Sequence, residues 1–178
     1  KENALRAVKF RQNVSSKFHQ TIGYCFYYLV LFGEEAYLIE YSAFGIEYLR
    51  KNNEIDPFYL SFCFDELIYQ YSPNNYEEIE NVINDAITYF EQQGHSKYVL
   101  NYLVKMASLK QEMGENTNTF QNKISDLIGG LNIGDINDPV LLTDILGVLP
   151  TNNNYLRSII KQLNIVKKYA EPFDKFNI

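Results

Sequence analysis

The sequence has no tryptophan and is poor in the residue types that most often build a catalytic or metal site. It holds only two cysteines and two histidines. Cys25 and Cys63 have no Cys-x-x-Cys pattern, which predicts buried free thiols rather than a disulfide framework or a zinc site. His19 and His95 lie far apart in the sequence, without a nucleophile motif or a group of carboxylates beside them. The sequence therefore indicates no catalytic residue, no metal and no cofactor, and we expect a protein that is not an enzyme.

Long apolar runs are also missing. The longest candidate, residues 22–32, covers eleven positions and is rich in tyrosine, whereas a membrane-spanning helix needs about 20 apolar residues. No secretory signal pattern is present. These absences favour a cytoplasmic protein that has no membrane partner.

Basic charge is scarce, with 16 Lys and Arg against 22 Asp and Glu and a net charge of −6. This balance argues against general electrostatic capture of nucleic acid. Residues 1–17 are the exception, since they carry five Lys or Arg and one Glu. Two interpretations stay open: a solvated helix end, or a helix linking to a further N-terminal domain. The start at Lys1, within a helical pattern and without Met, lends support to the second.

The periodicity of apolar residues predicts an all-α fold. Apolar residues recur at spacings of three and four, and no segment shows sustained alternation with a spacing of two. Gly, Pro, Asn and Asp mark the expected helix ends. These breaks lie at 33, 52–57, 72–75, 94–95, 114–116, 129–139 and 150–154.

The breaks divide the chain into about eight helices that form four antiparallel hairpins. We expect these hairpins at 17–51, 57–93, 96–128 and 139–170, within one repeat domain at 17–178 that follows a basic helix or linker stub at 1–16. A single hairpin cannot cover its own apolar face, so neighbouring hairpins must stack. The sequence therefore predicts a right-handed α-solenoid.

Recurring phrases with small residues at fixed places support this interpretation. They are Ile22-Gly23 before Phe26-Tyr27, Ile39-Glu40-Tyr41 before Gly45-Ile46-Glu47, Tyr76 before Ala86-Ile87, and Met106-Ala107 before Gly114-Glu115. The phrases resemble the tetratricopeptide repeat. Gly23, Gly45, Ala86 and Ala107 are expected where adjacent helices approach closely. The pattern departs from the family at Phe64 and Ile79, which replace small residues, and it fades beyond Gly129.

Such a degenerate array is similar to the C-terminal sensor domains of Gram-positive peptide-pheromone receptors, of the Rap, Rgg and arbitrium-receptor type, and also to scaffold proteins. The resemblance implies a non-enzymatic domain whose first helices line a concave groove that binds an extended peptide. In its sharper form it implies quorum sensing by a transcription regulator. DNA would then be contacted only through a missing N-terminal domain.

The resemblance also nominates peptide-binding residues. Lys17, Gln20, Tyr24 and Tyr27 come from the first hairpin, and Asn101, Lys105 and Ser108 come from the third. The last three are spaced by four and three residues, which places them on one polar stripe of a helix. Asn can bond a peptide backbone and Lys a carboxylate. The alternative for this stripe is an ordinary solvated face.

Two further features of the sequence concern the binding of partner molecules. Of the three close tyrosines Tyr24, Tyr27 and Tyr28, at least one is expected to line the groove, because a tyrosine ring packs well while its hydroxyl stays hydrated. The last helix carries an apolar stripe made of Ile159, Ile160, Leu163 and Val166. If exposed, this stripe predicts a scaffold subunit that forms a homodimer or a larger complex through its terminal hairpin.

Overall fold

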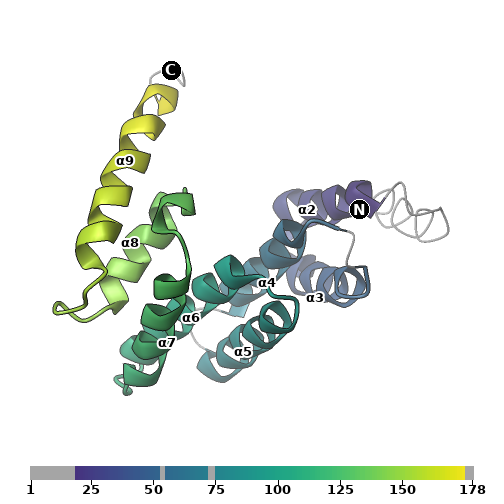
Figure 1. Ribbon diagram of the computed structural model, residues 1–178. Helices are drawn as coiled ribbons and strands as arrows, with labels where there is room; N and C mark the ends of the chain where they lie inside the picture. Colours follow the sequence, from purple (N-terminus) through teal and green to yellow (C-terminus); the bar gives the residue numbers. More distant parts are fainter. Residues whose placement is uncertain (1–18, 53–54, 72–74, 175–178) are drawn as a thin grey trace. The chain divides into compact units, whose positions relative to one another are not determined.

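The computed structural model describes residues 19–52, 55–71 and 75–174, and the side chains of this part except those at 19–21 and 169–174. Within these residues the secondary structure consists of eight α-helices, two short 3-10 helices and no strand (Figure 1). The predicted all-α class is therefore confirmed. The α-helices are α2 (His19–Phe32), α3 (Leu38–Leu49), α4 (Pro57–Tyr71), α5 (Tyr76–Gln92), α6 (Ser96–Glu112), α7 (Asn118–Gly130), α8 (Pro139–Val148) and α9 (Leu156–Asp174), and the 3-10 helices are η2 (Glu35–Tyr37) and η3 (Ile133–Asp135).

Helix ends lie close to where turn and capping residues predict them. The Asp138 carboxylate accepts bonds from the backbone N–H groups of Val140 and Leu141, at 2.9 and 3.1 Å, and so caps the first turn of α8. Gly94 and Gly114 follow α5 and α6 with φ of 72° and 71°, a conformation that glycine adopts without a steric penalty. Two helix ends lie beyond the expected residues. The helix expected to end at 128 continues as α7 through Gly130, and the helix expected to end at 170 continues as α9 through Asp174.

The chain forms two compact units, residues 1–82 and 83–178, so the boundary falls within α5. In the first unit α2 contacts both α3 and α4, and α3 contacts α4. Two glycines allow these close approaches, as predicted. A Cβ atom at Gly45 would lie 2.7 Å from the Sγ of Cys63, and one at Gly23 would overlap the ring of Tyr59. The core of this unit therefore depends on bare backbone at two helix crossings.

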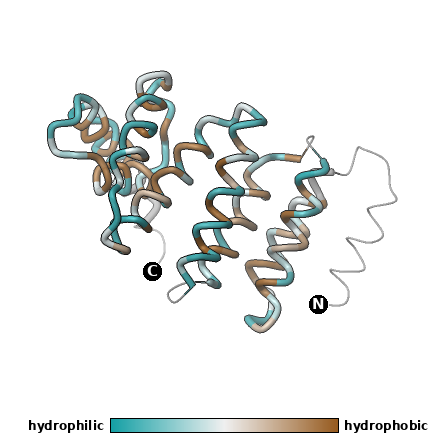
Figure 2. The backbone as a smooth tube through the Cα atoms, turned by 90° about the horizontal axis from the view of Figure 1, so that it is seen from below, coloured by the Kyte–Doolittle hydropathy of each residue, from teal (hydrophilic) through white to brown (hydrophobic). Residues whose placement is uncertain are grey.

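The second unit is built around α6, which contacts α7 and α8, while α8 contacts α9. Eight of the 17 residues of α6 are buried, including Tyr102 and Ala107. The ring of Phe90 on α5 stacks on that of Tyr102, with centroids 5.7 Å apart. Figure 2 shows hydrophobic and hydrophilic residues alternating along the helices, which is the amphipathic pattern that such packing needs.

Side-chain hydrogen bonds fix the loops of the second unit. Gln162 on α9 donates from Nε2 to the carbonyl oxygens of Gly134 and Ile136, each at 3.1 Å. Asn153 donates to the hydroxyl of Ser125 on α7 at 2.7 Å. The loops before α8 and before α9 are therefore bonded to helices of the same unit.

Three helix pairs agree with expected hairpins. Helices α2 and α3, α6 and α7, and α8 and α9 are consecutive and contact one another. The helices expected between 57 and 93 are α4 and α5. The stub at 1–16 lies outside the described residues. The right-handed stacking of all four hairpins into one solenoid stays a prediction.

Candidate functional site

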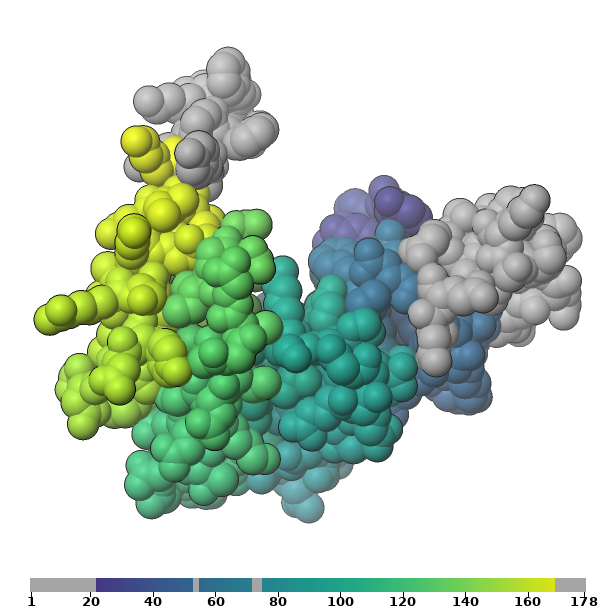
Figure 3. All heavy atoms as spheres, in the orientation of Figure 1, coloured from purple at the N-terminus to yellow at the C-terminus, as the bar shows by residue number. Residues whose placement is uncertain are grey.

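Six aromatic side chains form a continuous surface on α2 and α4. They are Tyr24, Tyr27, Tyr28 and Phe32 of α2 and Phe58 and Phe62 of α4, and we call them the aromatic surface. Figure 3 shows the side chains of α2, in purple, at the surface of the molecule.

Ring contacts connect the two helices within this surface. The Tyr27 ring centroid lies 4.6 Å from that of Phe62 and 5.9 Å from that of Phe58. Along α2 the centroids of Tyr28 and Phe32 are 5.8 Å apart. These spacings fall in the range in which aromatic pairs attract each other. The rings therefore hold one another in place.

The aromatic surface is open to solvent. Tyr24 and Tyr28 are 52% and 55% exposed, Phe58 is 47% exposed, and Phe32 is 74% exposed. Leu31, beside Phe32, is also exposed. Isolated exposed apolar residues are normal on proteins, but a contiguous group is characteristic of an interaction surface.

The helical period explains why α2 presents these rings. Phe26 and Leu29 are buried in the first unit. Tyr24, Tyr28 and Phe32 are spaced by four residues and lie on another side of the same helix. Helix α2 is thus apolar on its inner and outer sides, unlike an ordinary amphipathic helix.

The part of the chain that carries the aromatic surface is acidic. Residues 19–71 carry eight Asp or Glu but only two basic residues, Arg50 and Lys51. The ammonium of Lys51 is already bonded to Glu47 at 2.8 Å. Asp56 caps the start of α4, since it accepts a bond from the N–H of Phe58 at 2.9 Å. One carboxylate, that of Asp56, therefore lies at the α4 end of the aromatic surface, in a part of the chain whose net charge is negative.

The buried ring of Tyr59 lies next to that of Tyr24. Their ring centroids are 5.1 Å apart. Burial raises the pKa of Tyr59 above its ordinary value, and its hydrogen bond with Tyr24 and the charge of Asp56 raise it further. The Tyr59 hydroxyl therefore stays protonated at neutral pH and remains a hydrogen-bonding group.

Two of the residues nominated in the first hairpin belong to the aromatic surface. Tyr24 is exposed and Tyr27 is half-buried. Lys17 lies outside the described residues, and Gln20 lies in the first turn of α2 with its side chain outside them. Tyr28, the third member of the tyrosine group, is exposed as well.

Sequence reasoning missed Phe32, Phe58 and Phe62. Their spacing in the sequence was the signal that could have identified them. Phe32 lies four residues after Tyr28, and Phe58 and Phe62 are four apart at the start of a helix whose other side also holds large apolar residues. Apolar residues on both sides of a helix indicate either full burial or an exposed apolar face.

The polar stripe of the third hairpin lies on α6 and is partly covered. Asn101, Lys105 and Ser108 are half-buried on α6, while Leu100 and Leu103 on its other side are buried as expected. The stripe is therefore in partial contact with solvent, and its role in peptide binding stays a prediction.

Lys105 is engaged within its own unit. Its ammonium lies 6.0 Å from the ring centroid of Tyr102. Burial raises the pKa of Asp144 on α8, and the positive charge of Lys105 acts in the opposite direction. Lys105 on α6 therefore lies close to Asp144 on α8. The attraction between their opposite charges acts across the contact between these two helices. This stripe belongs to the second unit, whereas the aromatic surface belongs to the first.

The apolar stripe of the last helix is mostly internal, so the exposure on which the scaffold interpretation depends is largely missing. Ile159 and Leu163 are buried and Val166 is half-buried, whereas Ile160 is exposed. The contact between α8 and α9 explains this burial. Exposed apolar area on α9 is limited to Ile160 and Ile165 among its described side chains.

The described part of the chain offers neither a metal-binding cluster nor a membrane-spanning helix. Within 19–52, 55–71 and 75–174, no group of His, Cys, Asp and Glu side chains is arranged to hold a metal ion. None of the helices described here combines the length and the apolar character needed to cross a bilayer. Comparison of the chain with family models, curated proteins and solved structures found no match.

Proposed function

We propose that the chain is a non-enzymatic helical-repeat module that binds a short segment of another protein or a peptide on the aromatic surface. The observation that carries this proposal is the group of exposed, mutually contacting rings on α2 and α4. Burial of exposed apolar area contributes about 25 cal/mol per Å², so such a surface gains free energy when a partner covers it.

The helical-repeat part of the proposal is supported by helix neighbours inside each unit. In the first unit α2 contacts its hairpin partner α3 and the next first helix, α4. In the second unit α6 likewise contacts α7 and α8. Each hairpin of a repeat array contacts its neighbours in this way. In the tetratricopeptide-like array that we propose, α2 and α4 would be first helices, and the aromatic surface would lie on the helices that line its groove.

Charge complementarity defines the occupant. The rings supply apolar contact and, through their faces, attraction for cations. Acidic residues outnumber basic ones in the surrounding sequence. The partner that fits both properties is a segment with large apolar side chains flanked by Lys or Arg.

The sharper form of the proposal is the ligand-sensing part of a peptide-responsive transcription regulator. It is supported only by the resemblance of the repeat phrases to peptide-pheromone receptors. In this form the aromatic surface would hold the signalling peptide, and DNA would be contacted by another part of the regulator.

The proposal can be tested by selection from a displayed library of random twelve-residue peptides. The library is panned against the chain and against the double variant Tyr28→Ser/Phe32→Ser. We expect the unaltered chain to enrich peptides that combine aromatic or aliphatic residues with Lys or Arg, and the variant to lose this enrichment. Enrichment of acidic peptides, equal enrichment on both proteins, or none on either would contradict the proposal.

A scaffold subunit that assembles through its terminal hairpin is the second candidate. It is supported by the exposed side chains of Ile160 and Ile165 on α9. Two residues offer less apolar area than the six rings of the aromatic surface. A dimer that dissociates in the variant Ile160→Ser/Ile165→Ser, measured by sedimentation, would favour this candidate.

A further inference from the structure

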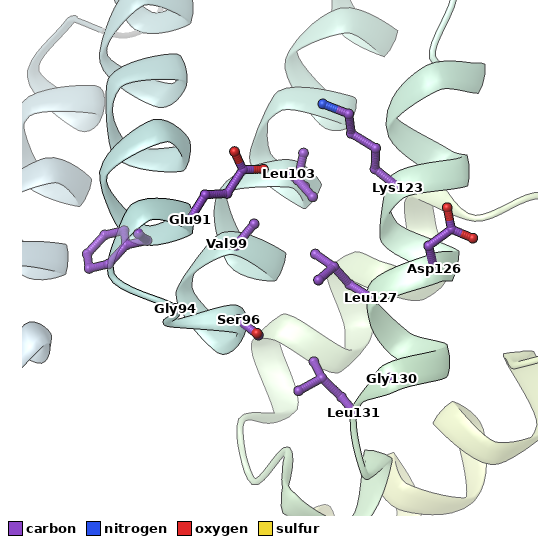
Figure 4. A pocket seen from close by; sticks show the side chains of 11 residues that line it. Glu91, Gly94, Ser96, Val99, Leu103, Lys123, Asp126, Leu127, Gly130 and Leu131 are labelled. Atoms are coloured by element: carbon purple, nitrogen blue, oxygen red, sulfur yellow. The ribbon is translucent and has the colours of Figure 1, made fainter.

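The second unit contains a pocket of about 480 Å³ between α5, α6 and α7 (Figure 4). Every residue that lines it belongs to this unit. The volume lies in the range of about 300–1,000 Å³ that is usual for small-ligand sites. The pocket involves none of the residues of the aromatic surface, so it is an independent feature.

The inner walls of the pocket are apolar. Phe90 of α5 and Val99 and Leu103 of α6 are buried residues that form one side. Leu127 of α7 and Leu131, which follows it, are half-buried and form the other side. Figure 4 shows the Leu127 side chain directed from α7 into the space between the helices. An apolar group that enters would displace water from these side chains.

Charged side chains lie at the exposed edge. Glu91 comes from α5, and Lys123 and Asp126 come from α7 on the other side of the pocket (Figure 4). Two carboxylates thus accompany one ammonium. All three side chains belong to exposed residues, so a bound ligand can reach them.

The helix ends at the pocket add to this excess of negative charge. Helices α5 and α7 both end at the pocket, near Gly94 and Gly130, and α6 begins there at Ser96. A helix C-terminus carries partial negative charge and an N-terminus partial positive charge. Two negative ends and one positive end therefore favour a cation, as do the carboxylates.

We propose that this pocket binds a ligand that joins an apolar body to one positively charged group. The body lies against Leu127, Val99 and Leu103, and the cation lies at the edge between Glu91 and Asp126. An amphiphilic amine has this chemistry, and so does a peptide with Leu or Phe next to Lys or Arg.

Three probes with one apolar body isolate the effect of charge. They are 4-phenylbutylamine, 4-phenylbutanol and 4-phenylbutyrate, titrated into the full ¹⁵N-labelled chain and followed by NMR. The amide signals of Gly94 and Gly130 report on the pocket, and those of Gly23 and Gly147 serve as controls. We expect the amine to bind most tightly and the carboxylate most weakly, with shifts at Gly94 and Gly130. Equal affinities, the reverse order, or shifts only at the control glycines would overturn the proposal.

A peptide probe distinguishes the two sources of this chemistry. Acetyl-Leu-Lys-amide carries an apolar side chain and an ammonium on a peptide backbone. Binding at least tenfold tighter than that of 4-phenylbutylamine would assign the pocket to a peptide, and weaker binding at Gly94 and Gly130 would assign it to a free amine. Failure of both probes to shift these signals would overturn the proposal.

A bulky side chain introduced at the pocket tests whether the amine binds there. A Cβ atom at Gly130 meets no other atom within 4 Å, and the same holds at Gly147 on α8. The variant Gly130→Phe places a ring at the pocket, and Gly147→Phe is the matched control. We expect the first variant to lose amine binding at least tenfold and the second to keep it. Equal binding by both would overturn the proposal.

Charge variants provide a test that does not depend on filling the pocket. Glu91→Gln and Asp126→Asn should each weaken amine binding about two- to fivefold, the range of exposed ion pairs. Lys123→Gln should strengthen it, because it removes a repulsive charge. Glu112→Gln, an exposed acidic residue of α6 that does not line the pocket, is the control. Unchanged affinity in all three pocket variants would overturn the assignment of the cation to this edge.

Discussion

The ring of Tyr59 on α4 lies directly against Gly23 on α2, at a place where a Cβ atom would overlap it. The two helices can approach here only because residue 23 has no side chain. This contact also fixes the position of Tyr59 under Tyr24, whose ring centroid is 5.1 Å away. The close packing at Gly23 therefore helps to hold Tyr59 in place next to the aromatic surface.

The first prediction concerns this glycine. Gly23→Ala should lower the free energy of unfolding by about 1–3 kcal/mol, because the ring of Tyr59 must shift. Urea denaturation followed by circular dichroism measures the effect. Gly147→Ala is the control, since open space surrounds its Cβ position, and alanine should raise helix stability there by about 0.5–1 kcal/mol. Equal effects of the two substitutions would contradict the packing described for α2 and α4.

The second prediction separates the two apolar sides of α2. Phe26 is completely buried, whereas Phe32 is 74% exposed. Phe26→Ala should lower the free energy of unfolding by about 3–5 kcal/mol, because it leaves a cavity. Phe32→Ala should change it by less than about 0.5 kcal/mol, as exposed positions usually do. A large loss of stability in Phe32→Ala would mean that the outer side of α2 is packed inside the protein.

Cys63 leads to the third prediction. Burial raises the pKa of this thiol to about 12, and the charge of Glu66 adds to the effect. The ordinary value of 9.0 applies in the unfolded chain. Between about pH 9 and 12 the folded state therefore keeps a proton that the unfolded state loses, so the contribution of Cys63 to stability falls as pH rises through this window.

Two measurements check this behaviour of Cys63. In the variant Cys25→Ser, a thiol reagent at pH 8 should label the remaining thiol only after denaturant is added, because the thiolate is the reactive form. Across pH 9 to 12, the stability of Cys63→Ala should fall less steeply than that of the unaltered chain. Rapid labelling of folded Cys25→Ser would show that Cys63 is accessible.

The helical boundaries could be predicted because local chemistry sets them. Asp56 and Asp138 precede prolines and cap α4 and α8, and Gly94 adopts the left-handed conformation that ends α5. These signals act within one helical turn. The end of α7 was missed because its two glycines remain helical, with Leu131 bonded to the carbonyl oxygens of Leu127 and Ile128. A glycine permits a helix end but does not require one.

The candidate site was only partly predictable, because exposure depends on contacts between distant residues. Spacing identified Tyr24 and Tyr27, but Phe58 and Phe62 join them only through the packing of α4 on α2. Ile159 and Leu163 show the opposite effect of such packing. They belong to the apolar stripe of the last helix, and the contact of α8 with α9 buries them. Helical periodicity shows which residues share a side of a helix, but not which side another helix covers.

The fourth prediction concerns Gln162, which is buried and bonds to two loop carbonyls. Gln162→Ala removes both bonds and leaves the oxygens of Gly134 and Ile136 without this partner. The free energy of unfolding should fall by about 1–3 kcal/mol. Gln111→Ala, at an exposed position of α6, should change it by less than about 0.5 kcal/mol. Equal stabilities would show that water replaces the side chain at no cost.

The affinity of the best library-selected peptide for three proteins tests the central claim most directly. Because the chain has no tryptophan, a single tryptophan in the peptide reports binding by its own fluorescence. The proteins are the unaltered chain, Tyr28→Ser/Phe32→Ser and the control Ile160→Ser/Ile165→Ser. The aromatic surface predicts that the first double variant binds at least about tenfold more weakly, because truncation of aromatic contact residues often costs more than 1 kcal/mol each, and that the control binds like the unaltered chain. Unchanged affinity in Tyr28→Ser/Phe32→Ser, or an equal loss in the control, would contradict the claim that the aromatic surface is the binding site.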